Sequence, residues 1–252
     1  MDMYRKALPL LFCAALAAQG AAQGPSGPWV PDRGDGTFVN PVLHADYSDP
    51  DVCAAPGGGF YMTASSFQCV PGLPILHSRD LVNWRLAGHA LPAVPPEDYY
   101  GAAPRHGRGV WAPSIRYHAG EFFIYWGDPD FGIFMVKTRH PEGAWEKPVL
   151  VKAGKGMIDP CPLWDDDGRL YLAHAWAGSR AGFNSVITVC ELNAAGTEAV
   201  GPEVLVFDGN DGTNHTVEGA KFYKRGGYYY IFAPAGGVEK GWQLALRSRS
   251  VY

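Results

Sequence analysis

Gly120-Glu121-Phe122-Phe123-Ile124 is a glycine turn followed by an aromatic β run, and the pattern recurs along the chain. The other copies are Gly58-Gly59-Phe60-Tyr61-Met62, Gly168-Arg169-Leu170-Tyr171-Leu172 and Gly227-Tyr228-Tyr229-Tyr230-Ile231. Turn residues that precede a run of aromatic and β-branched residues predict the second strand of a hairpin. Each copy is therefore predicted to belong to one hairpin of a repeated unit.

The spacing of the copies favours a β-propeller. When Tyr61, Phe123, Tyr171 and Tyr230 are taken as equivalent, the intervals are 62, 48 and 59 residues. Propeller blades repeat every ~40–50 residues, and long loops would account for the excess. A sandwich with irregular hairpins produces a similar pattern, so periodicity alone leaves both architectures open.

The composition predicts an all-β fold and disfavours several functions. The 252 residues include 32 Gly and 21 Pro, which suits many turns between short strands better than a helical bundle. The net charge of -4 lacks the Lys and Arg excess that a nucleic acid or an anionic membrane requires, so neither is an expected partner. The absence of GxGxxG, GxxxxGK[ST] and GxSxG motifs disfavours nucleotide-dependent and serine-hydrolase functions.

Residues 1–22 are predicted to be a signal peptide. The basic pair Arg5-Lys6 precedes a nearly uncharged apolar run over residues 7–18, and Gly20-Ala21-Ala22 offers small residues for cleavage. The run is shorter than a ~20-residue membrane span. The sequence therefore predicts an exported protein, periplasmic or extracellular, with residues 23–39 as an N-terminal linker.

The four cysteines that follow the predicted signal peptide show no metal-binding spacing. Cys53, Cys69, Cys161 and Cys190 form neither a CxxC pair nor a Cys/His pattern. We expect buried thiols in strands, with a Cys53–Cys69 disulfide as the alternative that an exported protein leaves open.

The repeat also places acidic residues in register. Counting twelve residues back from each equivalent aromatic residue reaches Asp49, Trp111, Asp159 and Glu218. In a propeller, equivalent positions of successive blades lie around the central axis at one height. These four side chains are therefore predicted to converge at one end of the central channel.

Converging carboxylates predict glycoside hydrolysis. Like charges in a partly dry pocket raise the pKa of at least one carboxyl group. Glycoside hydrolysis uses one carboxylic acid to protonate the leaving oxygen and a second carboxylate to activate water or to attack the sugar. Trp111 could stack on a sugar, although a core position is the alternative. Strand alternation predicts that Asp51 lies on the same side as Asp49, which makes it the competing candidate.

Several motifs, in order along the chain, resemble glycoside hydrolase family 43. They are Asn40-Pro41-Val42-Leu43, Tyr47-Ser48-Asp49-Pro50-Asp51, the stretch over residues 71–84, Gly109-Val110-Trp111-Ala112-Pro113-Ser114-Ile115, Ile158-Asp159-Pro160 and Val217-Glu218-Gly219. The resemblance implies a five-bladed β-propeller that hydrolyses glycosides with inversion. By the same resemblance Asp49 is the general base, Glu218 is the general acid, and Asp159 orients the acid and raises its pKa. Phe67 and Trp111 resemble the aromatic walls around the terminal sugar.

The resemblance also implies a substrate class and an incomplete domain. We expect terminal β-xylosyl or α-L-arabinofuranosyl residues of plant polysaccharide side chains or oligosaccharides as substrate. No cofactor is expected for the chemistry, although relatives often hold a structural calcium ion in the channel. Only about four blades are expected in residues 40–252, so the catalytic domain is expected to be incomplete at its C-terminus.

Three alternatives are weighed against this prediction. Retaining, fructan-cleaving relatives resemble a pattern with Asn before the first Asp-Pro and Arg before the second, whereas this chain has Ser48 and Ile158. A carbohydrate-binding propeller without catalysis has no need of Asp49 and Glu218 as acids. An inactive, truncated hydrolase fragment is the third alternative.

Overall fold

The computed structural model describes residues 28–252, of which Pro31–Tyr252 form one compact unit. The predicted signal peptide and the first residues of the predicted linker lie outside the described residues, so both stay predictions. No helix in residues 28–252 is long and apolar enough to cross a membrane.

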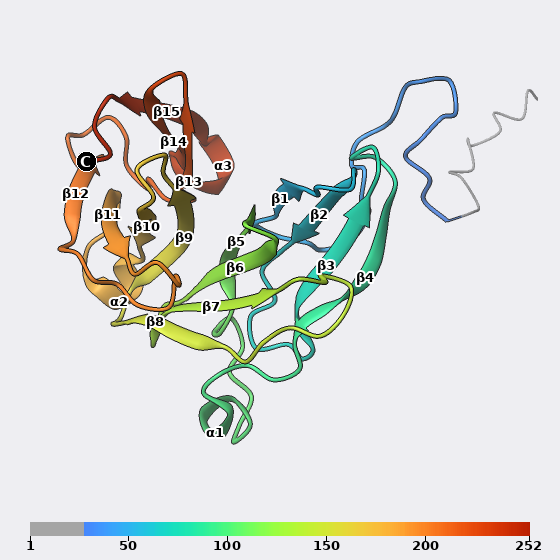
Figure 1. Ribbon diagram of the computed structural model, residues 1–252, viewed down its shortest axis with the longest axis horizontal. Helices are drawn as coiled ribbons and strands as arrows, with labels where there is room; N and C mark the ends of the chain where they lie inside the picture. Colours follow the sequence, from blue (N-terminus) through green and yellow to red (C-terminus); the bar gives the residue numbers. More distant parts are fainter. Residues whose placement is uncertain (1–27) are drawn as a thin grey trace, which may run out of the picture. The chain divides into compact units, whose positions relative to one another are not determined.

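The described strands form four antiparallel sheets that follow one another along the chain (Figure 1). In each sheet, strands adjacent in the sequence are also paired in space. The first sheet contains β1 (Asp51–Ala54), β2 (Phe60–Thr63), β3 (Gly72–Ser78) and β4 (Trp84–Leu91). The second contains β5 (Trp111–His118), β6 (Glu121–Asp128), β7 (Gly132–Thr138) and β8 (Val149–Ala153).

The remaining two sheets differ in size. The third contains β9 (Met157–Trp164), β10 (Leu170–Trp176), β11 (Val186–Leu192) and β12 (Val204–Asp208). The fourth contains only β13 (Lys221–Arg225), β14 (Tyr228–Ala235) and β15 (Trp242–Ser248). The prediction of an all-β propeller with about four blades is thereby confirmed.

The aromatic repeats form the second strand of every sheet, as the sequence predicts. They correspond to β2, β6, β10 and β14, and each pairs with the strand before it in an antiparallel hairpin. The turn before β10 is closed by hydrogen bonds from Asp165 N to Arg169 O (2.9 Å) and from Gly168 N to Asp165 O (3.1 Å). Local turn chemistry is therefore sufficient to place these hairpins.

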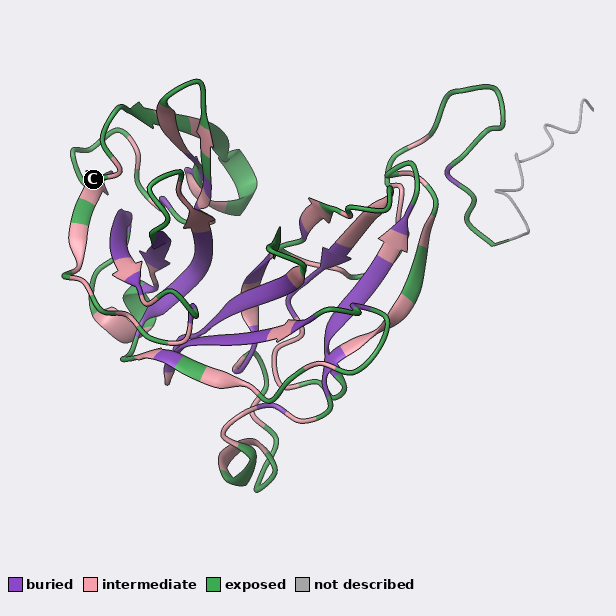
Figure 2. Cartoon of the chain, viewed as in Figure 1, coloured by how far each residue is buried: buried purple, intermediate pink, exposed green. Residues whose placement is uncertain are grey.

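The core consists of apolar layers between neighbouring sheets. The first strands of the sheets contact one another in order, β1 with β5, β5 with β9, and β9 with β13. Alternation along β6 serves two of these layers: Phe122 and Ile124 pack toward the first sheet, whereas Phe123 and Tyr125 pack toward the third. Both faces of the central sheets are thereby buried, as Figure 2 shows.

The described helices are single turns in connections between strands. They are α1 (Glu97–Tyr100), α2 (Gly178–Ala181) and α3 (Gly237–Lys240). In the fourth sheet, β15 is exposed over most of its length (Figure 2).

All four described cysteines are free thiols, so the alternative Cys53–Cys69 disulfide is wrong for this structure. Cys53 packs against the apolar layer between the first two sheets, whereas Cys69 is exposed in the connection between β2 and β3. Cys161 and Cys190 are buried, as expected. Burial raises the pKa of the Cys53 thiol to about 12 and that of Cys190 to about 11.

Candidate active site

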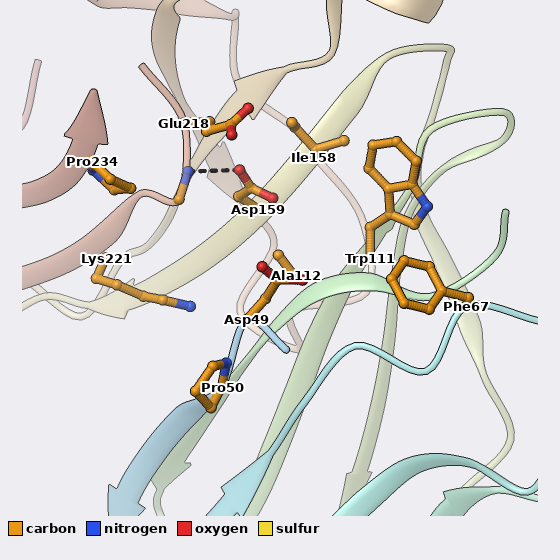
Figure 3. Close-up of a pocket in the computed structure, with 11 residues that line it drawn as sticks. Asp49, Pro50, Phe67, Trp111, Ala112, Ile158, Asp159, Glu218, Lys221 and Pro234 are labelled. Atoms are coloured by element: carbon orange, nitrogen blue, oxygen red, sulfur yellow. Dashed lines mark hydrogen bonds between the residues drawn. The ribbon is translucent and has the colours of Figure 1, made fainter. Parts of the chain in front are cut away.

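All five predicted site residues line one pocket of about 360 Å³. Figure 3 shows Asp49, Asp159 and Glu218 on one side of it, with Phe67 and Trp111 forming an aromatic wall. The other lining residues are Pro50, Ala112, Ile158, Gly219, Lys221 and Pro234. The structure therefore brings together Asp49, Asp159, Glu218, Phe67 and Trp111 in one pocket.

Each sheet contributes to the pocket at the start of its first strand. Asp49 precedes β1, Trp111 begins β5, Asp159 lies near the start of β9, and Glu218 precedes β13. Phe67 lies in the connection between β2 and β3. Residues far apart in the sequence thus meet because equivalent ends of the four sheets face the same space.

Backbone conformation at the pocket is unusual for non-glycine residues. Asp49 has φ 51°, Phe67 has φ 51° and Asp159 has φ 56°. This left-handed region costs roughly 1–3 kcal/mol for a non-glycine residue and is frequent at functional sites. Gly219, which follows Glu218, also has a positive φ of 65°.

Asp51, the competing carboxylate, does not line the pocket. It is buried and accepts hydrogen bonds from Ile115 N (2.8 Å) and from the Arg116 guanidinium (2.5 Å). The expectation that it shares a side with Asp49 is wrong because alternation holds only for extended backbone, and Asp49 is left-handed. Asp51 instead joins the first sheet to the second.

Asp49 is oriented by a hydroxyl group that the sequence analysis did not single out. Ser65 Oγ donates a hydrogen bond to Asp49 Oδ2 at 2.6 Å. The backbone supports this contact, since Ser65 N donates to Ser48 O at 3.0 Å. Ser65 lies just after the end of β2, and Asp49 lies just before the start of β1, which pairs with β2. The pairing of these two strands therefore brings the hydroxyl group to the carboxylate.

Asp159 and Glu218 both have raised pKa values. Burial is the first cause of the raised pKa of Glu218, and the negative charge of Asp49 is the second. Burial, together with the charges of Glu218 and Asp49, raises the pKa of Asp159 to about 7. A hydrogen bond from Gly219 N (2.6 Å) and the charge of Lys221 oppose this rise. The pocket therefore favours the protonated form of both carboxyl groups relative to exposed Asp and Glu.

The aromatic wall is held by backbone contacts from the first two sheets. Phe67 N donates to Val110 O at 2.9 Å, and Val110 N donates to Phe67 O at 3.0 Å. Trp111 Nε1 donates to Gly107 O at 2.9 Å. The guanidinium of Arg180, in α2, lies 5.6 Å from the centre of the Trp111 ring. The wall is thus fixed on the side of the pocket formed by the second sheet.

Lys221 is the second site residue that sequence reasoning missed. It begins β13 and lines the pocket beside the carboxylates. Its position three residues after Glu218 was the only available signal, because a single Lys near a strand start is usually a surface residue. Ser65 had no comparable signal, since its partner Asp49 is sixteen residues away in the sequence.

No group of three or more His, Cys, Asp or Glu side chains in residues 28–252 could hold a metal ion. Asp51, a buried carboxylate near the pocket, is already engaged by Ile115 N, Arg116 and Lys221. A structural calcium ion therefore stays a prediction.

The model of the glycosyl hydrolases family 43 matches residues 38–252. The chain belongs to glycosyl hydrolase family 43. The match covers all four sheets and every residue of the pocket. The matched residues also include every motif that resembles family 43 in the sequence.

Curated relatives in family 43 include enzymes named for two pentosides. The non-reducing end alpha-L-arabinofuranosidase BoGH43B of Bacteroides ovatus is 36% identical over 80% of this chain and 36% of its own length. The beta-xylosidase of Formosa agariphila is 32% identical over 86% of this chain and 37% of its own length. The chain thus spans less than half the length of these relatives.

Solved structures of family 43 proteins share the fold. A Bacteroides ovatus xyloglucan-locus GH43B superposes with a TM-score of 0.70 at 31% identity, covering 85% of this chain and 41% of that one. The xylan beta-1,4-xylosidase of Bacillus halodurans gives a TM-score of 0.71 at 29% identity, covering 84% and 41%. The four sheets therefore correspond to part of the relatives' longer chains.

Proposed function

We propose that this protein is an inverting glycoside hydrolase that releases terminal pentosyl residues from plant oligosaccharides or polysaccharide side chains. The observation that carries the proposal is the meeting of Asp49, Asp159 and Glu218, from three different sheets, in one pocket with an aromatic wall. A purely carbohydrate-binding site would need the wall and would have no use for buried, mutually repelling carboxyl groups.

The proposed reaction divides the work between Glu218 and Asp49. Glu218, kept protonated by its raised pKa, donates its proton to the leaving oxygen as the glycosidic bond breaks. Asp49 accepts a proton from water, which attacks the anomeric carbon from the opposite face of the sugar. Because water must fit between the base and the sugar, the two groups belong on different sheets, as they are here.

Asp159 is proposed to act through Glu218. Its carboxylate accepts the hydrogen bond from Gly219 N, directly after Glu218, and so fixes the backbone that carries the acid. When Asp159 is ionised, its charge would also favour the protonated form of Glu218. Asp159 is thus a positioning residue, with no bond of its own to make in the reaction.

The proposed substrates are β-xylosides and α-L-arabinofuranosides. Phe67 and Trp111 offer flat apolar faces to a sugar ring, and relatives are named for both pentosides. We also propose export from the cell, supported by the basic pair Arg5-Lys6 and the apolar run of residues 7–18. N-terminal sequencing of the exported protein should then begin near Gln23.

The deciding assay measures pentose release from aryl β-xylosides and aryl α-L-arabinofuranosides by the purified protein. Glu218→Gln should lose about 10²- to 10⁴-fold in rate on a substrate with a poor leaving group and much less on an activated aryl glycoside. Glu239→Gln, an exposed residue of α3, is the matched control and should retain activity. NMR of the first product should show the inverted anomer.

Three results would contradict the proposal in different ways. Equal losses of Glu218→Gln on both substrates would remove Glu218 from the acid role. A retained anomer would favour the retaining, fructan-type alternative. Sugar binding by the unmodified protein without hydrolysis would favour the carbohydrate-binding propeller.

A further inference from the structure

Trp242 lies at the end of the fourth sheet that carries the pocket. Lys221 at the start of β13 and Pro234 near the end of β14 both line the pocket. Because β15 is antiparallel to β14 and pairs Trp242 with Ala235, the residue after Pro234, β15 begins at that same end. Trp242 is 40% exposed and is not part of the pocket lining. An aromatic ring that is open to solvent therefore lies next to the lining of the pocket.

Three contacts hold this exposed ring in place. Its Nε1 donates a hydrogen bond to Asn214 Oδ1 at 3.3 Å. The His215 ring packs against it, with centroids 5.9 Å apart and an interplanar angle of 80°. Gly236, with φ 85°, leaves room for the ring, because a Cβ atom there would overlap Trp242 Cζ3. A ligand that stacks on a ring already immobilised does not have to order it, which favours binding.

The segment that carries Glu218 also supports Trp242. His215, which packs against the indole, stands three residues before Glu218. Gly236 N donates a hydrogen bond to His215 O at 2.8 Å, and Glu218 N donates one to Pro234 O at 3.2 Å. The indole and the proposed acid are therefore joined through one hydrogen-bonded segment at this end of the fourth sheet.

The proposed reaction places the leaving group on this side of the pocket. The general acid protonates the oxygen of the leaving group, so the leaving group lies on the side of the acid. Figure 3 shows Glu218 and Pro234 on one side of the pocket and Phe67 and Trp111 on the other. The pentose that is released is thus expected at the aromatic wall, and the leaving group is expected toward the fourth sheet.

Two aromatic side chains are available on the side of the acid. Among the described residues 209–220 and 234–242, which surround Glu218 and Pro234, the only aromatic side chains are those of His215 and Trp242. Both residues are exposed. A flat, apolar indole face is the kind of surface on which a sugar ring stacks. Trp242 is therefore the ring that a saccharide would meet as it extends from the pocket past the acid.

We propose that Trp242, held in place by His215, binds a sugar ring of the leaving group. This inference rests on the proposed function, because it assigns the leaving-group side of the same pocket. The ligand is a saccharide with at least one ring beyond the pentose that is released. Trp242 contributes binding and takes no part in the breaking of the bond.

The first test compares substrates that share the released pentose and differ in the leaving group. Xylobiose releases a sugar ring, whereas methyl β-xyloside releases methanol. In Trp242→Ala, kcat/KM on xylobiose should fall about tenfold, chiefly through KM, because stacking stabilises the ground state and the transition state alike. On methyl β-xyloside the loss should stay within about twofold, since methanol has no ring. An arabinofuranosyl disaccharide and methyl α-L-arabinofuranoside make the same comparison for the second pentose.

Two further variants separate stacking from a structural role. Trp242→Phe keeps a flat ring and should recover most of the loss on the disaccharide. Tyr117→Ala is the matched control: Tyr117 is 37% exposed and lies toward the end of β5, whose first residue Trp111 lines the pocket. This variant should show the same kcat/KM ratio between the two substrates as the unsubstituted protein. A merely structural role of Trp242 would lower kcat/KM equally on both substrates.

The second test detects binding without hydrolysis. The indole N–H signals of Glu218→Gln are followed by NMR while a pentose or the matching disaccharide is added, in the xylose and the arabinofuranose series. Substitution of Trp242 or Trp111 by Phe in this background identifies the two signals. The pentose should move the Trp111 signal, because it fills the pocket. The disaccharide should move both signals, because its second ring reaches Trp242.

The outcomes separate this inference from the proposed function. Hydrolysis with a Trp242 signal that the disaccharide leaves unmoved, or with equal losses of Trp242→Ala on both substrates, would overturn the binding role and retain the hydrolase. A Trp242 signal that moves as expected, in a protein that hydrolyses neither series, would refute the proposed function and retain the binding role. The absence of both hydrolysis and binding would overturn both proposals.

Discussion

Ser65 shows how a single residue can decide the orientation of a functional group. Its hydroxyl donates to Asp49 at 2.6 Å, and Asp49 has a left-handed φ of 51°. The left-handed residue turns its side chain into the pocket and leaves Asp51 to pair with Arg116 in the protein interior. Residue-level strain therefore separates two carboxylates that stand two positions apart in the sequence.

Removal of this hydroxyl should affect catalysis more than substrate binding. A hydrogen bond to a charged group is worth about 1.5–3 kcal/mol, so Ser65→Ala should lower kcat by roughly ten- to a hundredfold with little change in KM. The control is Ser66→Ala, because Ser66 Oγ instead accepts a hydrogen bond from Leu73 N at 3.0 Å. Steady-state kinetics on an aryl xyloside would give kcat and KM for both variants. An equal fall in kcat in Ser65→Ala and Ser66→Ala would contradict the orienting role of Ser65.

At the scale of elements, the aromatic wall depends on two connections that approach each other closely. The segment around Phe67 pairs with Val110 in an isolated antiparallel bridge. Gly109 makes this approach possible: its φ is 94°, and a Cβ atom there would lie 2.5 Å from Phe67 O. The connection before β5 thus requires glycine for both its conformation and its contact.

Gly109→Ala should therefore destabilise the protein and weaken the wall. We expect the free energy of unfolding to fall by about 2 kcal/mol or more, since the left-handed conformation and the backbone clash both add cost. Gly107→Ala is the matched control, with φ 70° and no atom within 4 Å of the added Cβ, and should lose only about 1 kcal/mol. Urea unfolding would give the free energy of unfolding of both variants. Equal losses in Gly109→Ala and Gly107→Ala would contradict a close approach of Gly109 to Phe67.

At the scale of the whole described fold, charged side chains that do not line the pocket join neighbouring sheets. Glu203 Oε1 lies 2.7 Å from His174 Nε2 of β10, and Lys152 of β8 contacts the other carboxylate oxygen. Burial alone would raise the pKa of Glu203, but the hydrogen bond and charge of His174 together with Lys152 lower it to about 2. One carboxylate therefore links the second sheet to the third.

This link should make stability depend on pH under acidic conditions. Because the pKa of Glu203 is lower in the folded state than its ordinary value of 4.5, its contribution is present above that value and is lost as the pH falls toward 2. We expect the loss to be about 1–2 kcal/mol after allowance for solvent screening. Glu203→Gln should reduce this pH dependence, whereas Glu198→Gln, an exposed change, should not. Urea unfolding at pH 7 and at about pH 3 gives the change in the free energy of unfolding between the two pH values. The same change in Glu203→Gln as in the unsubstituted protein would contradict the role of Glu203.

The sequence alone predicted the repeated hairpins and the three carboxyl groups of the pocket. Aromatic runs such as Tyr228-Tyr229-Tyr230 and their glycine turns are local signals, and hairpins form from local signals. Since a propeller repeats the same hairpin around an axis, a constant offset from each run also located Asp49, Asp159 and Glu218. The offset located these three residues because they occupy equivalent positions in the repeat, whereas periodicity alone left a propeller and a sandwich both open.

The neighbours that act on those residues became visible only in the folded chain. The pairing of Asp51 with Arg116, the hydroxyl of Ser65 beside Asp49 and the ammonium of Lys221 near Asp51 all join segments from different strands or sheets. Such contacts depend on left-handed backbone and on packing between sheets, which leave no periodic trace in the sequence. The free thiols of Cys53 and Cys69 follow the same rule, because a disulfide requires spatial closeness that spacing along the chain does not determine.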